Sequence, residues 1–216
     1  MKIGILLAMD RERDAAVAVL GGQEGVLAGN TIRIATSGMG KVNAAIATTR
    51  LILEFKPDCI ISSGCAGGLA PDVRQMSIVV SSEVCYHDVW CGEGNEPGQV
   101  QGLPARFASD PQLYRKALET KCGAVIHGGL ICSGDLFVDS VEAARGILAA
   151  NPEAIAVDME SGAIAQTCYR AGVPFISLRV ISDTVTADDR TAQYEGFWND
   201  IADNSFDFLK AFLEQL

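Results

Sequence analysis

Acidic and small polar residues gather at five points of the chain, each directly after an apolar run that can form a buried strand. The groups are Asp10 with Glu12, residues 63–68, residues 133–135, residues 158–160, and Ser182 with Asp183. Ligands of open α/β sheets bind outside the carboxyl ends of the strands. One such carboxylate is usually a helix cap, but five coinciding groups indicate a site. Carboxylates on opposite sides of a substrate can protonate a leaving group and deprotonate a water molecule.

Other kinds of site are not favoured by the sequence. Neither G-x-G-x-x-G nor G-x-x-x-x-G-K-[ST] is present, which argues against dinucleotide and P-loop sites. The seven cysteines form no C-x-x-C pair, and the two histidines, His87 and His127, lie far apart in the chain. We therefore expect free, buried thiols, no metal site and no disulfide framework.

Composition limits the class of protein. The chain has 216 residues, of which 49% are hydrophobic, and this suits one α/β domain over residues 1–216. Its net charge of −10 would repel a phosphate backbone, so we expect no nucleic-acid partner. No apolar run is long enough for a membrane span. The apolar opening ends in charges and lacks a small-residue cleavage site, so we interpret it as the first strand of a cytoplasmic protein.

The elements that must position these groups alternate between strand and helix. Hydrophobic periodicity predicts strands at residues 2–8, 31–36, 59–62, 76–84, 124–132, 154–157 and 173–181. It predicts helices at residues 11–20, 41–55, 110–121, 139–150, 160–171 and 197–216, with Asp139 and Glu142 as a D-x-x-E cap. This order indicates a largely parallel sheet flanked by helices. Residues 88–109 form a long irregular segment, which we expect to be a functional loop or an interface arm.

Seven stretches resemble, in order, the 5′-methylthioadenosine/S-adenosylhomocysteine nucleosidases of the purine nucleoside phosphorylase superfamily. They are MKIGILLAMDRE, SGMGKVNAA, SGCAGGLAP, IVVSSEVCYHD, SGDLF, AVDMESGAIA and LRVISD. Each stretch is short, but the seven in this order span almost the whole chain. The resemblance implies a three-layer α/β/α sandwich around a mixed, partly closed β-sheet, a homodimer and no cofactor.

The resemblance also implies roles for individual carboxylates. Glu12 matches the residue that activates the attacking water, and Asp183 matches the acid that protonates the leaving purine at N7. Glu160 matches the carboxylate that binds the ribose hydroxyls, with Met159 packed on the sugar. The chemistry itself needs these types, because breaking an N-ribosidic bond develops a ribosyl cation and a purine anion. An acid with a raised pKa can protonate the purine, and a base can deprotonate the attacking water. A third carboxylate can stabilise the sugar by accepting hydrogen bonds from its hydroxyls.

Further positions match the family's binding residues. Phe137 resembles the ring that stacks on the base, and the Val138 backbone would hydrogen-bond the purine edge. Tyr194 falls, after a one-residue gap, where the family has an aromatic over base and sugar. Arg179 and Ser182 match residues that orient the water and Asp183, respectively.

The chain departs from the family pattern in three places. Cys65, which we assign to substrate binding with its neighbours Ala66 and Gly67, replaces a serine that touches the catalytic water, and a thiol is a poorer hydrogen-bonding group. Asp158, also assigned to substrate binding, replaces a glutamate near the sugar. Residues 88–109 lack the aromatics with which the family reaches into the partner subunit's site.

The predicted reaction is hydrolysis of methylthioadenosine, S-adenosylhomocysteine or 5′-deoxyadenosine to adenine and a ribose derivative. The phosphorylase signature G-D-P-x-R is absent, Ser62 replaces a phosphate-binding arginine, and Arg11 and Arg13 fit no phosphate pattern. Futalosine or aminodeoxyfutalosine hydrolysis, phosphorolysis and non-catalytic nucleoside binding remain alternatives. The sequence leaves open the 5′ substituent and the choice between adenine and hypoxanthine.

Overall fold

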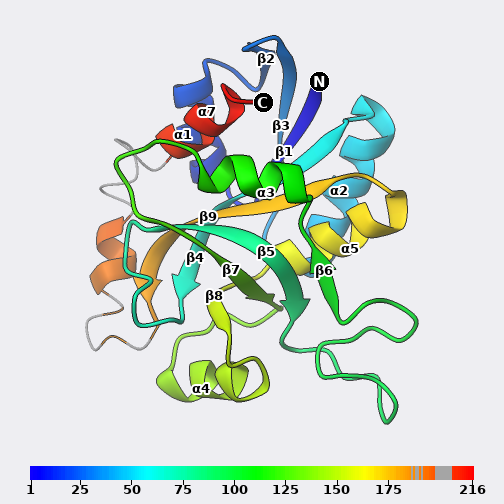
Figure 1. Ribbon diagram of the computed structural model, residues 1–216, viewed down its shortest axis with the longest axis vertical. Helices are drawn as coiled ribbons and strands as arrows, with labels where there is room; N and C mark the ends of the chain where they lie inside the picture. The colour runs from blue at the N-terminus through cyan, green and yellow to red at the C-terminus, as the bar shows by residue number, and fades with distance from the viewer. Residues whose placement is uncertain (186, 188–189, 191, 198–205) are drawn as a thin grey trace.

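One mixed β-sheet forms the centre of the fold, and helices lie on both of its faces (Figure 1). The computed structural model describes residues 1–185, 187, 190, 192–197 and 206–216. The strands are β1 (Lys2–Leu7), β2 (Glu24–Leu27), β3 (Asn30–Thr36), β4 (Cys59–Gly68), β5 (Ile78–Tyr86), β6 (Arg106–Ala108), β7 (Ile126–Ser133), β8 (Ala154–Asp158) and β9 (Phe175–Thr184). The labelled helices are α1 (Asp10–Leu20), α2 (Lys41–Phe55), α3 (Pro111–Leu118), α4 (Val141–Ala150), α5 (Ser161–Ala171) and α7 (Asp207–Leu213).

Part of the sheet closes on itself. The strand order is β2-β3-β1-β4-β8-β7-β5-β6, and β9 pairs with both β4 and β5, which completes a ring β4-β8-β7-β5-β9. The pairs β1–β3, β1–β4, β4–β9, β5–β7 and β7–β8 are parallel, whereas β2–β3, β4–β8, β5–β6 and β5–β9 are antiparallel. Most of the paired residues belong to the parallel pairings, so the largely parallel sheet predicted from the alternation is confirmed. The antiparallel pairings were not predicted, because periodicity carries no strand direction. The mixed, partly closed sheet implied by the resemblance is confirmed.

Alternating side chains of the sheet build a core on each face. Ile3, Ile5 and Leu7 of β1 join one cluster with residues of α1, α3 and α7. Leu6, between them in the strand, joins a second cluster with residues of α2 and α5. Successive side chains of a strand point to opposite faces, so one buried strand supports both layers of helices.

The carboxyl ends of several strands meet although the sheet is mixed. β4 and β8 run antiparallel, but they overlap only at their last residues, Gly67 beside Val157 and Gly68 beside Ala156. β9 runs parallel to β4 along its length, so its end reaches the same place. The polar groups that follow these strands are thereby brought together, as the sequence predicts.

Some elements differ from their predicted bounds. β4 continues through the glycine-rich stretch to Gly68, and the short strands β2 and β6 have too few buried residues to give a pattern. Helix α4 is capped by Ser140, whose Oγ accepts the Ala143 N–H at 3.2 Å, so the predicted Asp139 cap is wrong. Of the helix predicted at residues 197–216, residues 198–205 lie outside the described residues, and α7 lies in the remainder.

Candidate active site

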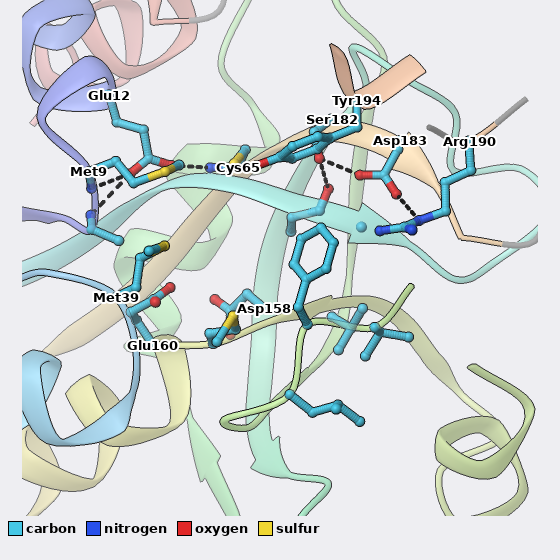
Figure 2. Close-up of a pocket in the computed structure, with 18 residues that line it drawn as sticks. Met9, Glu12, Met39, Cys65, Asp158, Glu160, Ser182, Asp183, Arg190 and Tyr194 are labelled. Atoms are coloured by element: carbon cyan, nitrogen blue, oxygen red, sulfur yellow. Dashed lines mark hydrogen bonds and ion pairs between the residues drawn. The ribbon is translucent and has the colours of Figure 1, made fainter. Parts of the chain in front are cut away.

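A cavity opens where β4, β8 and β9 end (Figure 2). The predicted residues that line it are Glu12, Cys65, Ala66, Gly67, Phe137, Val138, Asp158, Met159, Glu160, Ser182, Asp183 and Tyr194. Arg179 lies behind the wall instead. The lining residues that sequence reasoning missed are Ala8, Met9, Met39, Leu136, Val157 and Arg190.

Glu12 is fixed by backbone amides from two elements. It lies in the first turn of α1, directly after β1, and is 2% exposed. Its Oε2 accepts the N–H groups of Ala8 and Met9, each at 3.0 Å, and its Oε1 accepts the Cys65 N–H at 2.9 Å. These bonds hold the carboxylate at one end of the cavity, opposite Asp183 (Figure 2).

Gly64 allows this carboxylate to approach β4. Its φ of 145° lies in the region that favours glycine. A Cβ atom at this position would lie 2.7 Å from Glu12 Oε1 and 3.2 Å from Arg179 Nη1. The glycine in the stretch SGCAGG is therefore required by packing against charged side chains.

Arg179 is a buried cation between carboxylates. It is 2% exposed, and its Nε and Nη2 each lie 2.7 Å from Asp158 Oδ2. Nη2 also donates to the hydroxyls of Ser62 at 2.8 Å and Ser161 at 2.9 Å. Burial acts to lower the pKa of Arg179, but the surrounding carboxylates, Asp158 first, outweigh it and raise the pKa. The carboxylate of Asp158 is thus occupied by Arg179 and Ser161, although the residue lines the cavity.

Glu160 stands between β8 and α5 with fewer partners. Its Oε1 accepts the N–H of Gly40 at 2.8 Å. Burial raises the pKa of Glu160 to about 7, and the nearby Asp158 charge adds to this rise, while Arg179 and the Gly40 N–H oppose it. Around neutral pH this side chain exchanges between its protonated and ionised forms.

Asp183 and Ser182 both reach the cavity because of an irregularity in β9. The register against β4 shifts between Ala66 and Gly67, so Ala66 pairs with Ile181 and Gly67 with Asp183. Ser182 is the extra residue, as in a β-bulge, a feature that re-aims side chains next to active sites. Its Oγ donates to Asp183 Oδ1 at 2.6 Å.

Arg190 makes an ion pair with Asp183 that the sequence analysis did not anticipate. Its Nε lies 2.7 Å from Asp183 Oδ2, and its guanidinium carbon lies 5.1 Å from the ring centroid of Phe137. None of the seven family-like stretches contains this arginine, so only its proximity to Asp183 in sequence could have suggested it. Among the described residues that line the cavity, Arg190 is the one cation, whereas a phosphate dianion is normally held by several arginines.

Aromatic side chains form another part of the lining. Phe137 is 50% exposed, and its ring contacts Tyr194 edge-on with centroids 5.6 Å apart. Neither residue is part of the buried core. Val138, which follows, is buried in a cluster with Val157.

The thiol of Cys65 is not suited to nucleophilic attack. Burial raises the pKa of Cys65 well above its usual value, and the neighbouring Glu12 raises it further. The thiolate, which is the nucleophilic form, is therefore disfavoured. Its backbone N–H, which binds Glu12, is its defined contribution to the site.

Comparisons with known proteins find similarity along almost the whole chain. The model of the phosphorylase superfamily matches residues 2–214. A 5′-methylthioadenosine/S-adenosylhomocysteine nucleosidase of Haemophilus influenzae is 42% identical over 197 residues, which cover 85% of this chain and 86% of the relative. The nucleosidase of Neisseria meningitidis in complex with methylthio-immucillin-A is 36% identical, with a TM-score of 0.90 over 100% of this chain and 99% of its own. The nucleosidase of Colwellia psychrerythraea in complex with adenine is 34% identical, with a TM-score of 0.90 over 100% and 96%.

The raised pKa of Glu160 predicts a pH-dependent effect of Glu160→Gln on stability. The folded protein retains a proton that the unfolded chain releases above pH 4.5, so the stability contributed by the wild-type side chain is lost as pH rises through about 7. From pH 4 to pH 8 the unfolding free energy of the variant should rise relative to wild type, by on the order of 3 kcal/mol. Urea unfolding at several pH values measures this, with Glu54→Gln, an exposed position on α2, as control. A pH-independent difference for Glu160→Gln would contradict the assignment.

Proposed function

The chain belongs to the 5′-methylthioadenosine/S-adenosylhomocysteine nucleosidase family of the phosphorylase superfamily, and on this basis we propose how its side chains divide the reaction. It is a nucleoside N-glycosyl hydrolase, which cleaves the N-glycosidic bond of a 5′-modified purine nucleoside and releases adenine. One observation carries the proposed division of roles. Glu12, Glu160 and Asp183 are buried around one cavity, and each has a different set of partners.

Asp183 is the general acid for the leaving base. Its carboxyl lies at the end of the cavity next to Phe137, on which the purine would stack, and the backbone of Val138 would bind the purine edge. Ser182 holds one carboxyl oxygen at 2.6 Å, which orients the other toward the base. Arg190 pairs with that other oxygen, so this ion pair must open before the oxygen can donate a proton to the purine.

Glu12 is the general base for water at the opposite end of the cavity. Its amide partners hold the carboxylate ionised and in one position, so it needs little reorganisation to orient a water molecule. Arg179 supports this end of the cavity from behind the wall, near Gly64. The ribose would lie between the two acids, with Met159 packed on it.

Glu160 binds the ribose hydroxyls through charge-assisted hydrogen bonds. Burial destabilises the ionised form of Glu160, and a pair of ribose hydroxyls would supply hydrogen-bond donors that stabilise it. Substrate binding and ionisation of Glu160 should therefore favour each other.

Water as the acceptor predicts base release without phosphate. Methylthioadenosine should give adenine at the same rate in phosphate-free and phosphate-containing buffer, as followed by chromatography. A panel of S-adenosylhomocysteine, 5′-deoxyadenosine and futalosine then identifies the preferred 5′ substituent and base. Strict dependence on phosphate would indicate a phosphorylase, and hypoxanthine release from futalosine alone would indicate a futalosine hydrolase. Tight binding without turnover over hours would indicate a nucleoside-binding protein.

The two catalytic carboxylates should differ in their response to the leaving group. Both Asp183→Asn and Glu12→Gln should lose on the order of 10²–10⁴ in kcat, the usual contribution of a general acid or base. A nucleoside with an activated leaving group needs little protonation, so it should largely restore the rate of Asp183→Asn. It should not restore Glu12→Gln, whose water still lacks a base. Equal rescue of both variants, or of neither, would mean that the two roles are wrongly assigned.

A homodimer is supported by an exposed apolar stripe beside the cavity. Val42, Ile46 and Leu53 of α2 are 70%, 50% and 69% exposed, and their spacing places them on one side of the helix. Met39, just before α2, is 60% exposed and also lines the cavity. The connection between β5 and β6 projects from the body of the molecule in Figure 1, as an interface arm would. A second copy covering this face would enclose the cavity.

Charged substitutions on this stripe should separate the subunits. Val42→Glu with Ile46→Lys should convert a dimer of about 46 kDa into a monomer near 22.8 kDa in sedimentation. Activity should fall with the dimer, because the open cavity would admit water around the substrate. Glu54→Lys, an exposed position about 80–120° around α2 from the stripe residues, provides a charge-changing control. A fully active wild-type monomer would contradict the proposal.

A cytoplasmic location is consistent with the cysteines. All seven are free thiols, and free thiols are typical of a reducing compartment. Four of them are buried and two are half-buried, but Cys91 is exposed, so the prediction of buried thiols is wrong for that residue. No helix in the described part of the chain combines the length and apolar character that a membrane crossing requires.

A further inference from the structure

Three of the family-like stretches contribute charged residues that meet beside the cavity but do not line it. Lys41 comes from SGMGKVNAA, Asp88 from IVVSSEVCYHD and Asp135 from SGDLF. Lys41 Nζ lies 2.7 Å from Asp88 Oδ2, and the N–H of Asp135 donates to the same oxygen at 2.8 Å. The roles proposed above for the catalytic and binding residues leave all three unexplained.

Asp135 fixes the first residue of α2. Its Oδ1 accepts the backbone N–H of Lys41 at 2.7 Å. The preceding residue is Gly40, whose φ of 88° favours glycine and where a Cβ atom would lie 3.0 Å from the same oxygen. Gly40 in turn donates its N–H to Glu160 Oε1 at 2.8 Å. Two successive amides at the start of α2 therefore bind two carboxylates, Asp135 and Glu160.

Asp88 links the other two residues, because its Oδ2 accepts hydrogen bonds from both the Lys41 side chain and the Asp135 backbone. Burial acts against its ionised form, but the hydrogen bonds from Lys41 and from the Asp135 N–H outweigh this and keep the pKa of Asp88 below its usual value. Gly134 makes room for it, since a Cβ atom there would lie 2.8 Å from Asp88 Cγ and 2.6 Å from the His87 ring. Close packing against Asp88 and His87 therefore explains why the S-G-D stretch has glycine at position 134.

We infer that Lys41, Asp88 and Asp135 form a clamp that positions the Gly40 N–H against Glu160 and so sets the geometry of the ribose-binding carboxylate. The inference rests on the proposed function, which gives Glu160 that role. The three residues act through Gly40 and touch no substrate, so they are positioning residues. The clamp also joins the first residue of the 88–109 segment to the sugar site, 47 residues from both Lys41 and Asp135 in sequence.

The clamp has a consequence that simple loss of stability would not reproduce. The groups that face Glu160 are Asp158 on β8, Arg179 on β9, Glu12 on α1 and the Gly40 N–H before α2. If the amide withdraws, the ionised form loses one of its two stabilising partners. The pKa of Glu160 should then move above its present value of about 7.

Asp135→Ala tests the clamp against two matched variants. It should raise KM for methylthioadenosine roughly tenfold with little change in kcat, about the effect of losing one charge-assisted hydrogen bond. The pH at which kcat/KM falls on acidification should also move upward. Asp135→Asn keeps an oxygen for the Lys41 N–H and should stay close to wild type. Asp139→Ala, four residues further along, removes an exposed carboxylate from the same connection and should change neither quantity.

A titration of the ligand-free protein separates this inference from the proposed function. Carbon NMR of labelled glutamate carboxyls, with Glu160 identified by its loss in Glu160→Gln, should give a higher midpoint in Asp135→Ala than in wild type. A folded Asp135→Ala with wild-type KM and an unchanged midpoint would overturn the clamp, as would equal effects of Asp135→Ala and Asp139→Ala. If Glu160→Gln keeps wild-type KM, the ribose role fails, while the shifted midpoint would still support the clamp.

Discussion

The ion pair between Arg179 and Asp158 is the interaction on which the site depends. Burying a guanidinium that is 2% exposed would destabilise the fold strongly if its charge were unpaired, and the same is true of the buried carboxylates around it. Two contacts of 2.7 Å to Asp158 and hydrogen bonds to two serine hydroxyls satisfy it. Its positive charge also faces Glu12 and Glu160, which permits three acidic side chains to be buried within one small region.

The remaining acids differ because their partners differ. Glu12 has three backbone amides, Glu160 has one amide and a raised pKa, and Asp183 has a hydroxyl and Arg190. Carboxyl groups can serve as base, sugar ligand and acid in one site when their surroundings give them different proton affinities. Apolar side chains, including Phe137 and Tyr194, line the cavity around these acids and lower the local dielectric constant, which strengthens each of these interactions.

Strand β9 joins the stability of the fold to the chemistry. It pairs with β4 on one edge and β5 on the other, which closes the ring of strands and buries Arg179 within it. Four residues later the same strand delivers Asp183 to the cavity, and the register shift brings Ser182 to the same side. The buried cation and the proposed general acid therefore share one rigid element, a placement that favours precise geometry.

The sequence by itself determined the local elements and the chemical types at their ends. Helix α2 has its predicted bounds. Glu12, Glu160 and Asp183 each come shortly after an apolar run that periodicity predicts to be a strand. Only the tertiary structure decided how these groups pair. Periodicity reports burial and not strand direction, so the closure of the sheet through β9 could not be predicted from it. The contact between Gly40 and Glu160 joins residues 120 positions apart, and Arg190 meets Asp183 through a segment outside every recognised stretch. Such contacts depend on which strands become neighbours, and that is set by packing of the whole chain.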